Sequence, residues 1–264
     1  MGFEVCALAS GSSGNCVYVA SSKARLLIDI GLSCKMITAR LYNLGVRPEM
    51  LDAILITHEH SDHCQGLSTI CKRWHAPILA STGTWKKLVP PPGLATNRRI
   101  DFIPGQRITI GDLTVMPFEL PHDATMPTGF RIESSTTSFA LATDLGYLSD
   151  DVRRQLDGAE VLIFESNHDT EMLRRGPYPA YLKRRILSQR GHLSNDQSGE
   201  SLRELVGPHT KAVFLAHLSK ENNHPDLAWR TAYDYLCAAG RRPGQDFELL
   251  LTHRDRPTEL FQLP

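Results

Sequence analysis

The chain of 264 residues lacks several features that mark whole classes of protein. Its six cysteines form no CxxC pair and no regular framework, which argues against a disulfide scaffold and predicts reduced thiols. No apolar run is long enough to cross a bilayer and no charged-then-apolar leader is visible, so we expect a cytoplasmic protein without a membrane partner. The formal net charge is zero, so any site for a polyanion must be local.

The length and the 41% content of hydrophobic residues predict a full core within a single domain covering residues 1–264. No internal repeat or low-complexity segment is visible. The proline-rich stretch 90–93 is interpreted as a loop and not as a domain boundary. The sequence indicates no oligomeric state.

Patterns of hydrophobic residues predict two β-rich regions combined with helices. Residues 3–9, 16–20 and 25–30 are expected to form strands, and helices are expected from Ser33 to Leu44, with Gly45 as a stop, and from about Gln65 to Trp74. A further run of strands, interpreted as antiparallel, precedes alternating helices and strands, an order that fits two sheets flanked by helices. These strands are predicted at 77–80, 99–103, 107–110, 113–118, 128–132 and 138–143, and the later elements at 161–164, 179–189, 196–205, 212–216 and 225–239.

The densest group of chemically active side chains is the run His58-Glu59-His60-Ser61-Asp62-His63. It directly follows the strand-like residues 52–57, where a buried strand gives way to a loop. Neutral imidazole and carboxylate together favour borderline divalent cations such as zinc, iron or manganese. The alternative is a polar turn with solvated histidines, but a lone histidine would fit that interpretation better than this cluster does. The sequence therefore predicts a metal site here.

The pattern HxHxDH after a buried strand resembles the signature of the metallo-β-lactamase-fold hydrolases. The resemblance implies an αββα four-layer sandwich, with two mixed β-sheets flanked by helices and a dinuclear site at one edge. His60 stands where the flavodiiron oxidoreductases of this fold have a glutamate, which favours a hydrolytic centre over a redox centre. Only 73 positions separate Asp144 from His217, which is too few for the extra domain of the β-CASP nucleases.

Three later residues follow predicted strands and resemble the remaining ligand motifs of this family: His122, Asp144 in a TDLG context, and His217. For His122 alone a hydrogen-bonded loop histidine is an open alternative, and Asp123 beside it could be confused with the ligand. The resemblance implies one ion held by His58, His60 and His122, a second held by Asp62, His63 and His217, and Asp144 as the bridge between them.

Glu165 and His192 resemble residues of the tRNA 3′-processing endonucleases of the same fold. A carboxylate that orients a proton-donating histidine suits phosphodiester cleavage, because the leaving alkoxide must be protonated. The alternative is a helix-capping loop with Ser194 or Asn195 as the N-cap and an incidental histidine. In the catalytic interpretation Asp62 and Asp144 also hold the hydroxide nucleophile.

The full set of motifs resembles the bacterial YycJ/WalJ/VicX branch, which is associated with exonuclease activity on DNA. The resemblance covers residues from about 4 to 255. The residues of these motifs that are candidates for substrate binding are Ser12, Ser13, Asn15, His168, Asn222 and Asn223. The turn at 10–15 could present backbone N–H groups to a phosphate or be a plain tight turn. A phosphate-tracking rim and a solvated helix face are both open for Arg174, Arg175, Lys183, Arg184, Arg185 and Arg190.

These features together predict a hydrolase that uses two divalent ions, zinc or manganese, to cleave phosphodiesters as a nuclease of the exonuclease type, with DNA favoured over RNA as its substrate. One alternative is a metal-dependent hydrolase of a small ester, lactone, thioester or cyclic nucleotide. An alternative of another class is a non-catalytic regulatory or nucleic-acid-binding module that keeps metal for structure. Seven donors in an open pair argue against this last class, because structural zinc sites are closed four-ligand cages.

Overall fold

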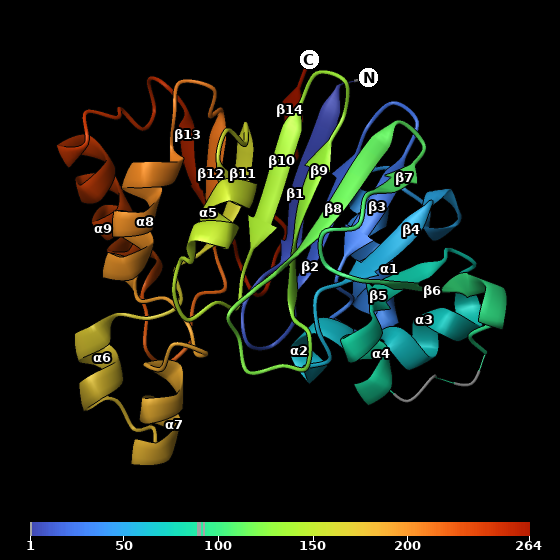
Figure 1. Cartoon of the computed structure of the whole chain (residues 1–264), viewed down its shortest axis with the longest axis horizontal. Helices are drawn as coiled ribbons and strands as arrows, with labels where there is room; N and C mark the ends of the chain where they lie inside the picture. Colours follow the sequence, from blue (N-terminus) through green and yellow to red (C-terminus); the bar gives the residue numbers. More distant parts are fainter. Residues whose placement is uncertain (1, 89–90, 92) are drawn as a thin grey trace.

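Two seven-stranded sheets form the centre of the computed structural model, which describes residues 2–88, 91 and 93–264 (Figure 1). The first sheet has the order β14 (Phe261–Leu263), β1 (Phe3–Ala9), β2 (Cys16–Ala20), β3 (Arg25–Ile28), β4 (Ala53–Ile56), β5 (Ile78–Ser81), β6 (Arg99–Phe102). The second has the order β13 (Glu248–Leu251), β12 (Ala212–Ala216), β11 (Val161–Glu165), β10 (Ser138–Ala142), β9 (Thr128–Glu133), β8 (Leu113–Glu119), β7 (Ile108–Ile110). Both sheets mix parallel and antiparallel pairs.

Helices cover the outer face of each sheet. The first sheet packs against α1 (Cys34–Asn43), α3 (Leu67–Arg73) and α4 (Thr82–Lys87), and the second against α5 (Asp150–Leu156), α8 (Asn195–Leu205) and α9 (Pro225–Ala238). The remaining helical segments are η1 (Pro48–Met50), α2 (Ser61–Cys64), η2 (Thr96–Arg98), α6 (Thr170–Arg175) and α7 (Ala180–Ile186).

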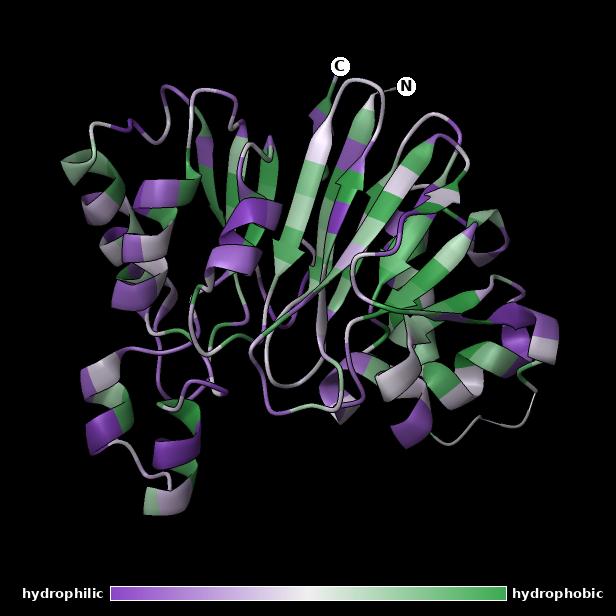
Figure 2. Ribbon diagram, in the orientation of Figure 1, coloured by the Kyte–Doolittle hydropathy of each residue, from purple (hydrophilic) through white to green (hydrophobic). Residues whose placement is uncertain are grey.

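Three apolar cores match this layering. Within β4, Leu55 packs in the core between the sheets, while Ile54 and Ile56 pack beneath α1 and α3. A strand buried on both faces explains the continuous apolar run of this segment. Figure 2 shows that most strands of the two sheets are mainly hydrophobic along their length. The order helices, sheet, sheet, helices confirms the expected αββα four-layer sandwich.

The predicted elements are present, with three differences. The segments 77–80 and 99–103 were expected to be antiparallel, which is wrong: β5 pairs in parallel with β4 and with β6, inside the first sheet. Helical crossovers through α3 and α4 impose this direction, because parallel neighbours need a long connection. The second helix begins later than predicted, at Leu67, after the separate turn α2. The short elements α4, α5, α6, β13 and β14 were not predicted.

The expected helix at residues 33–44 forms as α1, with Ser33 as its N-cap and Gly45 at a φ of 73° just after its end. All six cysteines are free thiols. Positions 90 and 92 of the proline-rich stretch lie outside the described residues. Over the part of the chain that the structure describes, no helix combines the length and apolar character that crossing a bilayer requires.

Strand ends from both sheets meet along one edge of the sandwich, opposite the two termini (Figure 1). The loops after β3, β4, β8, β10, β11 and β12 lie there, and they carry the predicted metal ligands and catalytic residues. Within the described residues, the non-glycine residues with positive φ are all at this edge: Asp29 at 62°, Asp144 at 65° and His217 at 59°. Backbone strain of this kind persists where the surrounding structure holds it and is concentrated at functional sites.

Candidate metal centre and active site

The loop after β4 carries histidines that differ in burial. His58 and His63 are buried at 1% and 0% exposure, and His60 is the N-cap of the short helix α2. Cys64 does not face a metal donor, because its Sγ contacts the carbonyl oxygens of Glu59 and His60 at 3.3 and 3.1 Å. It supports the loop.

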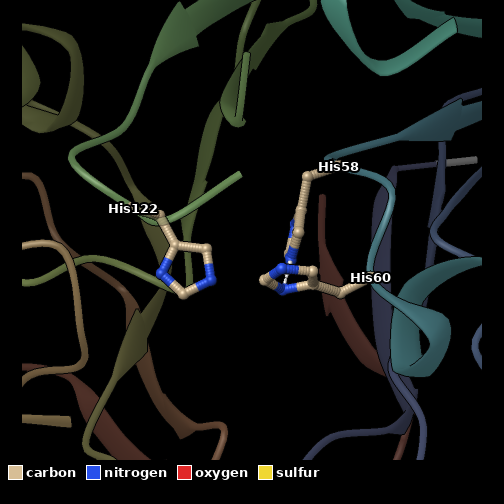
Figure 3. Close-up of side chains that lie close together, drawn as sticks. All are labelled: His58, His60 and His122. Atoms are coloured by element: carbon tan, nitrogen blue, oxygen red, sulfur yellow. Dashed lines mark hydrogen bonds between the residues drawn. The ribbon is translucent and has the colours of Figure 1, made fainter. Parts of the chain in front are cut away.

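His58, His60 and His122 form the first group of donors, and their rings converge in Figure 3. One nitrogen from each ring lies within 4.8 Å of the others, and Nε2 of His58 is 3.0 Å from Nδ1 of His60. Nδ1 of His122 is 3.1 Å from the carbonyl oxygen of Gly191, so this nitrogen carries the proton. The opposite nitrogen of His122 is therefore free to bind a metal.

Asp62, His63 and His217 form the second group. Oδ2 of Asp62 lies 3.5 Å from Nε2 of His63 and 3.7 Å from Nε2 of His217. The Nδ1 atoms of both rings contact carboxylates, so Nε2 of each is unprotonated when the ring is neutral. The second group thus offers two imidazole nitrogens and a carboxylate.

Asp144 lies between the two groups. Its Oδ2 is 3.2 Å from Nε2 of His63, and its Oδ1 is 3.8 Å from Nε2 of His122. Its side chain is 3% exposed and reaches this position from a left-handed backbone conformation just beyond β10. The geometry therefore places a carboxylate where it can contact ions in both groups at once.

Asp29 is a site residue that the sequence reasoning missed. Its Oδ2 is 2.7 Å from Nδ1 of His63, and its carboxylate also accepts hydrogen bonds from the backbone N–H and the hydroxyl of Thr57. The Thr57 hydroxyl is in turn 3.0 Å from Nδ1 of His58. Asp29 thereby orients donors of both groups, as carboxylates commonly do behind metal-binding histidines. The available signal was an aspartate at the end of a buried strand next to the metal-binding strand.

Glu165 is the centre of a second positioning network. Oε1 of Glu165 is 2.9 Å from Nδ1 of His192 and 2.8 Å from Nδ1 of His217. Oε2 accepts hydrogen bonds from the backbone N–H groups of Leu145 and Leu193. The predicted Glu165–His192 pair is therefore in contact, and the same carboxylate also holds a predicted metal ligand.

Both interpretations of the loop around His192 describe part of the structure. Ser194 is the N-cap of α8, and Gln197 completes a capping box. His192 is nevertheless not incidental, since its ring contacts Glu165 and lines the cleft over the metal donors. The helix cap fixes the loop, and the loop directs the ring.

The buried charges stabilise one another. Burial raises the pKa of the Asp144 carboxyl, but His217 and His63 outweigh burial and hold this pKa well below its usual range. Burial also lowers the pKa of His217, but the neighbouring carboxylates of Asp144, Asp62 and Glu165 raise it to about 10. Burial, followed by the charge of His63, lowers the pKa of His58. The carboxylates thus attract positive charge to the second group, while His58 stays neutral and ready to bind a metal.

These residues fit a divalent-metal centre. Nε2 of His122, Nε2 of His217 and Oδ2 of Asp144 are buried and have no hydrogen-bond partner among the described residues. Buried polar atoms without partners are costly, and each of these three residues belongs to a group of donors that could hold an ion. Cations bound to these groups would satisfy them. The mixed nitrogen and oxygen donor set suits zinc or manganese.

A cleft of about 230 Å³ opens over these donors and is lined by residues from several loops. Ser12 lines it, and Ser12 and Ser13 are exposed, so both remain candidates for substrate contact. The turn that carries them is held by Asn15, whose Oδ1 accepts the N–H of Gly11 at 2.8 Å. The turn is therefore both tight and open at its tip.

The structure buries four of the predicted substrate contacts, Asn15, His168, Asn222 and Asn223. Asn15 lies 3.1 Å from Nε2 of His63, and Asn223 bonds Asn195 and the backbone of the loop after β11. Asn15 and Asn223 thus hold the loops together. Contact of the four residues with a substrate stays a prediction.

Comparisons with known proteins agree with this geometry. The family model for the beta-lactamase superfamily domain matches residues 24–217. The chain is 41% identical over 266 residues to the exodeoxyribonuclease WalJ of Streptococcus pneumoniae serotype 2 (strain D39 / NCTC 7466), covering 100% of this chain and 99% of that one. It is 38% identical to the exodeoxyribonuclease YycJ of Bacillus anthracis, covering 98% and 99%. The metallo-beta-lactamase fold protein YhfI from Bacillus subtilis has a similar structure, with a TM-score of 0.73 over 98% of this chain and 99% of that one at 18% identity.

Proposed function

The chain belongs to the β-lactamase superfamily, in the branch of WalJ and YycJ, and on this premise we propose that it is an exodeoxyribonuclease with two divalent metal ions. It is a metal-dependent hydrolase by this membership. DNA as the substrate is supported by the names of the two full-length relatives. The proposed first ion is held by His58, His60 and His122, the second by Asp62, His63 and His217, with Asp144 as the bridge.

The observation that carries the proposal is the contact between Glu165 and His192 beside the metal donors. The 2.9 Å bond between Oε1 of Glu165 and Nδ1 of His192 leaves the opposite ring nitrogen for the cleft. Hydrolysis of an unactivated phosphodiester needs a proton for its leaving oxygen, whereas a stable leaving group needs none. An oriented histidine at the mouth of the site therefore favours phosphodiester cleavage over hydrolysis of a thioester, whose thiolate leaves without a proton.

Different residues of the chain would have different roles in phosphodiester hydrolysis. A pair of divalent ions bound at this site would lower the pKa of water and neutralise charge on a phosphoryl group. Asp62 and Asp144 orient the attacking water, His192 donates a proton to the departing oxygen, and Glu165 holds His192 in position. Asp29 and Glu165 fix the imidazoles of His63 and His217. The metals are proposed to be zinc or manganese.

The remaining proposals concern the setting of the enzyme. We propose that residues 1–264 act as a single domain and that the protein works in the cytoplasm on DNA ends. The alternatives of a small-ester hydrolase and of a non-catalytic module are not favoured, since both full-length relatives are named as exodeoxyribonucleases.

The proposal predicts which substrates the metal-loaded protein turns over. It should release nucleotides progressively from end-labelled DNA and hydrolyse bis-p-nitrophenyl phosphate, with little turnover of a β-lactam. The measurement is gel analysis of end-labelled single- and double-stranded DNA and RNA beside a spectrophotometric β-lactam assay. Efficient hydrolysis of a β-lactam or lactone, without any degradation of nucleic acid, would refute the proposal.

A further inference from the structure

Residues 170–190, which we call the arm, form α6 and α7 and project beyond the edge of the sheets where the metal donors lie (Figure 1). The arm carries six basic side chains against one acidic side chain, Glu171, in a chain with no net charge. The basic residues are Arg174, Arg175, Lys183, Arg184, Arg185 and Arg190. This local excess of positive charge can attract a polyanion, which the net charge of the whole chain cannot do.

The arm forms one wall of the metal cleft. Tyr178, Leu182, Arg185 and Ile186 line the cleft together with five site residues from other loops, His60, Asp62, Asp144, His192 and His217. A substrate that reaches the metal donors therefore also meets the arm. The arm is thus placed to contact the part of the substrate next to the reacting phosphate.

Arg185 is held in place at this wall by Asp123, the neighbour of His122. Nη2 of Arg185 donates to Oδ1 of Asp123 at 3.1 Å, and Nε donates to Oδ2. A guanidinium has five N–H donors, so this two-point contact leaves three of them for another acceptor. The Arg185 side chain is 50% exposed, which leaves these donors open to solvent and to a phosphate.

The base of the arm is packed too tightly to swing freely. A Cβ at Gly191 would lie 2.1 Å from the carbonyl oxygen of Ile186, and a Cβ at Gly146 would lie 2.2 Å from the carbonyl carbon of Gln189. Nε of Arg190 also donates to the carbonyl oxygen of His122 at 3.2 Å. These close backbone contacts fix α7 relative to the first group of metal donors.

Two tyrosines extend the same surface. Tyr178 lines the cleft, and Tyr181 is 68% exposed. Tyr181 precedes Arg185 by four residues, so the two side chains are neighbours on the surface of α7. Tyr178 is partly buried and Tyr181 is exposed. Accessible tyrosines beside arginines suit single strands, because the rings stack on bases while the guanidinium groups contact phosphates.

We propose that the arm grips the single-stranded end of a DNA substrate, with Arg185 on a backbone phosphate and Tyr178 and Tyr181 stacked against unpaired bases. This inference rests on the proposed nuclease function. Bases in a duplex are already stacked and paired, so the arm would favour a single-stranded end over a blunt one.

Steady-state kinetics of the metal-loaded enzyme test whether the arm binds unpaired bases. Two substrates are compared: a single-stranded oligonucleotide of about 20 nucleotides, and the same strand with abasic terminal positions. The wild type should show a KM about tenfold or more higher on the abasic strand. The double variant Tyr178→Ala/Tyr181→Ala should raise KM on the intact strand by a similar factor, so that its KM values on the intact and the abasic strand become equal. The kcat of this variant should not change. The double variant with phenylalanine at both positions should restore wild-type behaviour, since the rings still stack.

Further variants test whether the effect on KM is specific to the arm. Tyr42→Ala, which removes another exposed tyrosine on α1, should behave as wild type. Arg185→Gln should lower the slope of log KM against log salt concentration by about one. An unchanged KM in the double alanine variant, or equal losses with phenylalanine, would overturn the arm proposal. Failure of the wild type to degrade any DNA would overturn the proposed function instead.

Discussion

Replacing Asp144 is expected to remove both the metal pair and the activity. Its carboxylate lies within 4 Å of nitrogen atoms from both groups of donors, so its loss leaves the two ions without their shared ligand. Metal ions supply several kcal/mol of transition-state stabilisation, so we expect Asp144→Ala to lower kcat/KM by about 10³-fold or more. Elemental analysis and the DNA assay on the same preparation measure both effects.

The backbone at Asp144 calls for a second variant. Its φ of 65° is unfavourable for alanine, whereas asparagine tolerates this conformation and keeps the size of the side chain. Asp144→Asn should therefore fold normally and still lose metal and activity. Asp151→Ala, which removes an aspartate with an 85% exposed side chain on α5, is the matched control and should keep both. An Asp144→Asn enzyme that retains two ions and the wild-type rate would contradict the assignment of the bridge.

Replacing His192 should separate chemistry from metal binding. Its Nδ1 is held by Glu165, while its ring lines the cleft and belongs to neither proposed ligand group. We expect His192→Ala to lower the rate on DNA by roughly 10²- to 10⁴-fold while the metal content stays intact. The defect should be smaller on bis-p-nitrophenyl phosphate, because p-nitrophenolate leaves without a proton. Rates on both substrates and metal content for the same variant are the measurement.

The control for His192→Ala is His209→Ala, which removes an exposed histidine far along the chain and should leave rate and metal unchanged. Loss of metal from the His192 variant would make this residue a ligand. Equal impairment on good and poor leaving groups would remove it from the role of general acid. Glu165→Ala is expected to cost more than His192→Ala and to weaken metal binding, because Glu165 also holds His217. The two effects should be strongly non-additive.

Hydrophobic pattern predicted most strands, but it did not predict their direction. The run at Ile78–Ser81 shows that a segment is buried and says nothing about its neighbours. Direction depends on the connection, and the crossover helix α4, Thr82–Lys87, has too few apolar positions to be visible. The strand Phe261–Leu263 has only three residues, too few to show a pattern. It forms through its pairing with β1, at the other end of the chain.

The side chains that come together as candidate metal donors could be selected from the sequence because they stand in short motifs at strand ends. The contacts that orient them could not, because they join residues that are distant in the sequence. Asp29 is 34 positions from His63, and Glu165 is 52 positions from His217. Local patterns likewise did not distinguish Asn223, which is buried in a loop network, from Ser12, which faces the cleft. Position in the sheets decides these roles, and residue type alone does not.

The most direct test of a dinuclear DNA-cleaving centre is a titration of metal-free protein with zinc or manganese while nucleotide release from end-labelled DNA is followed. Seven donors in two groups joined by Asp144 predict that activity rises until two equivalents of metal per chain are bound and then stays constant. Full activity at one equivalent, or DNA degradation by protein without metal, would contradict the account.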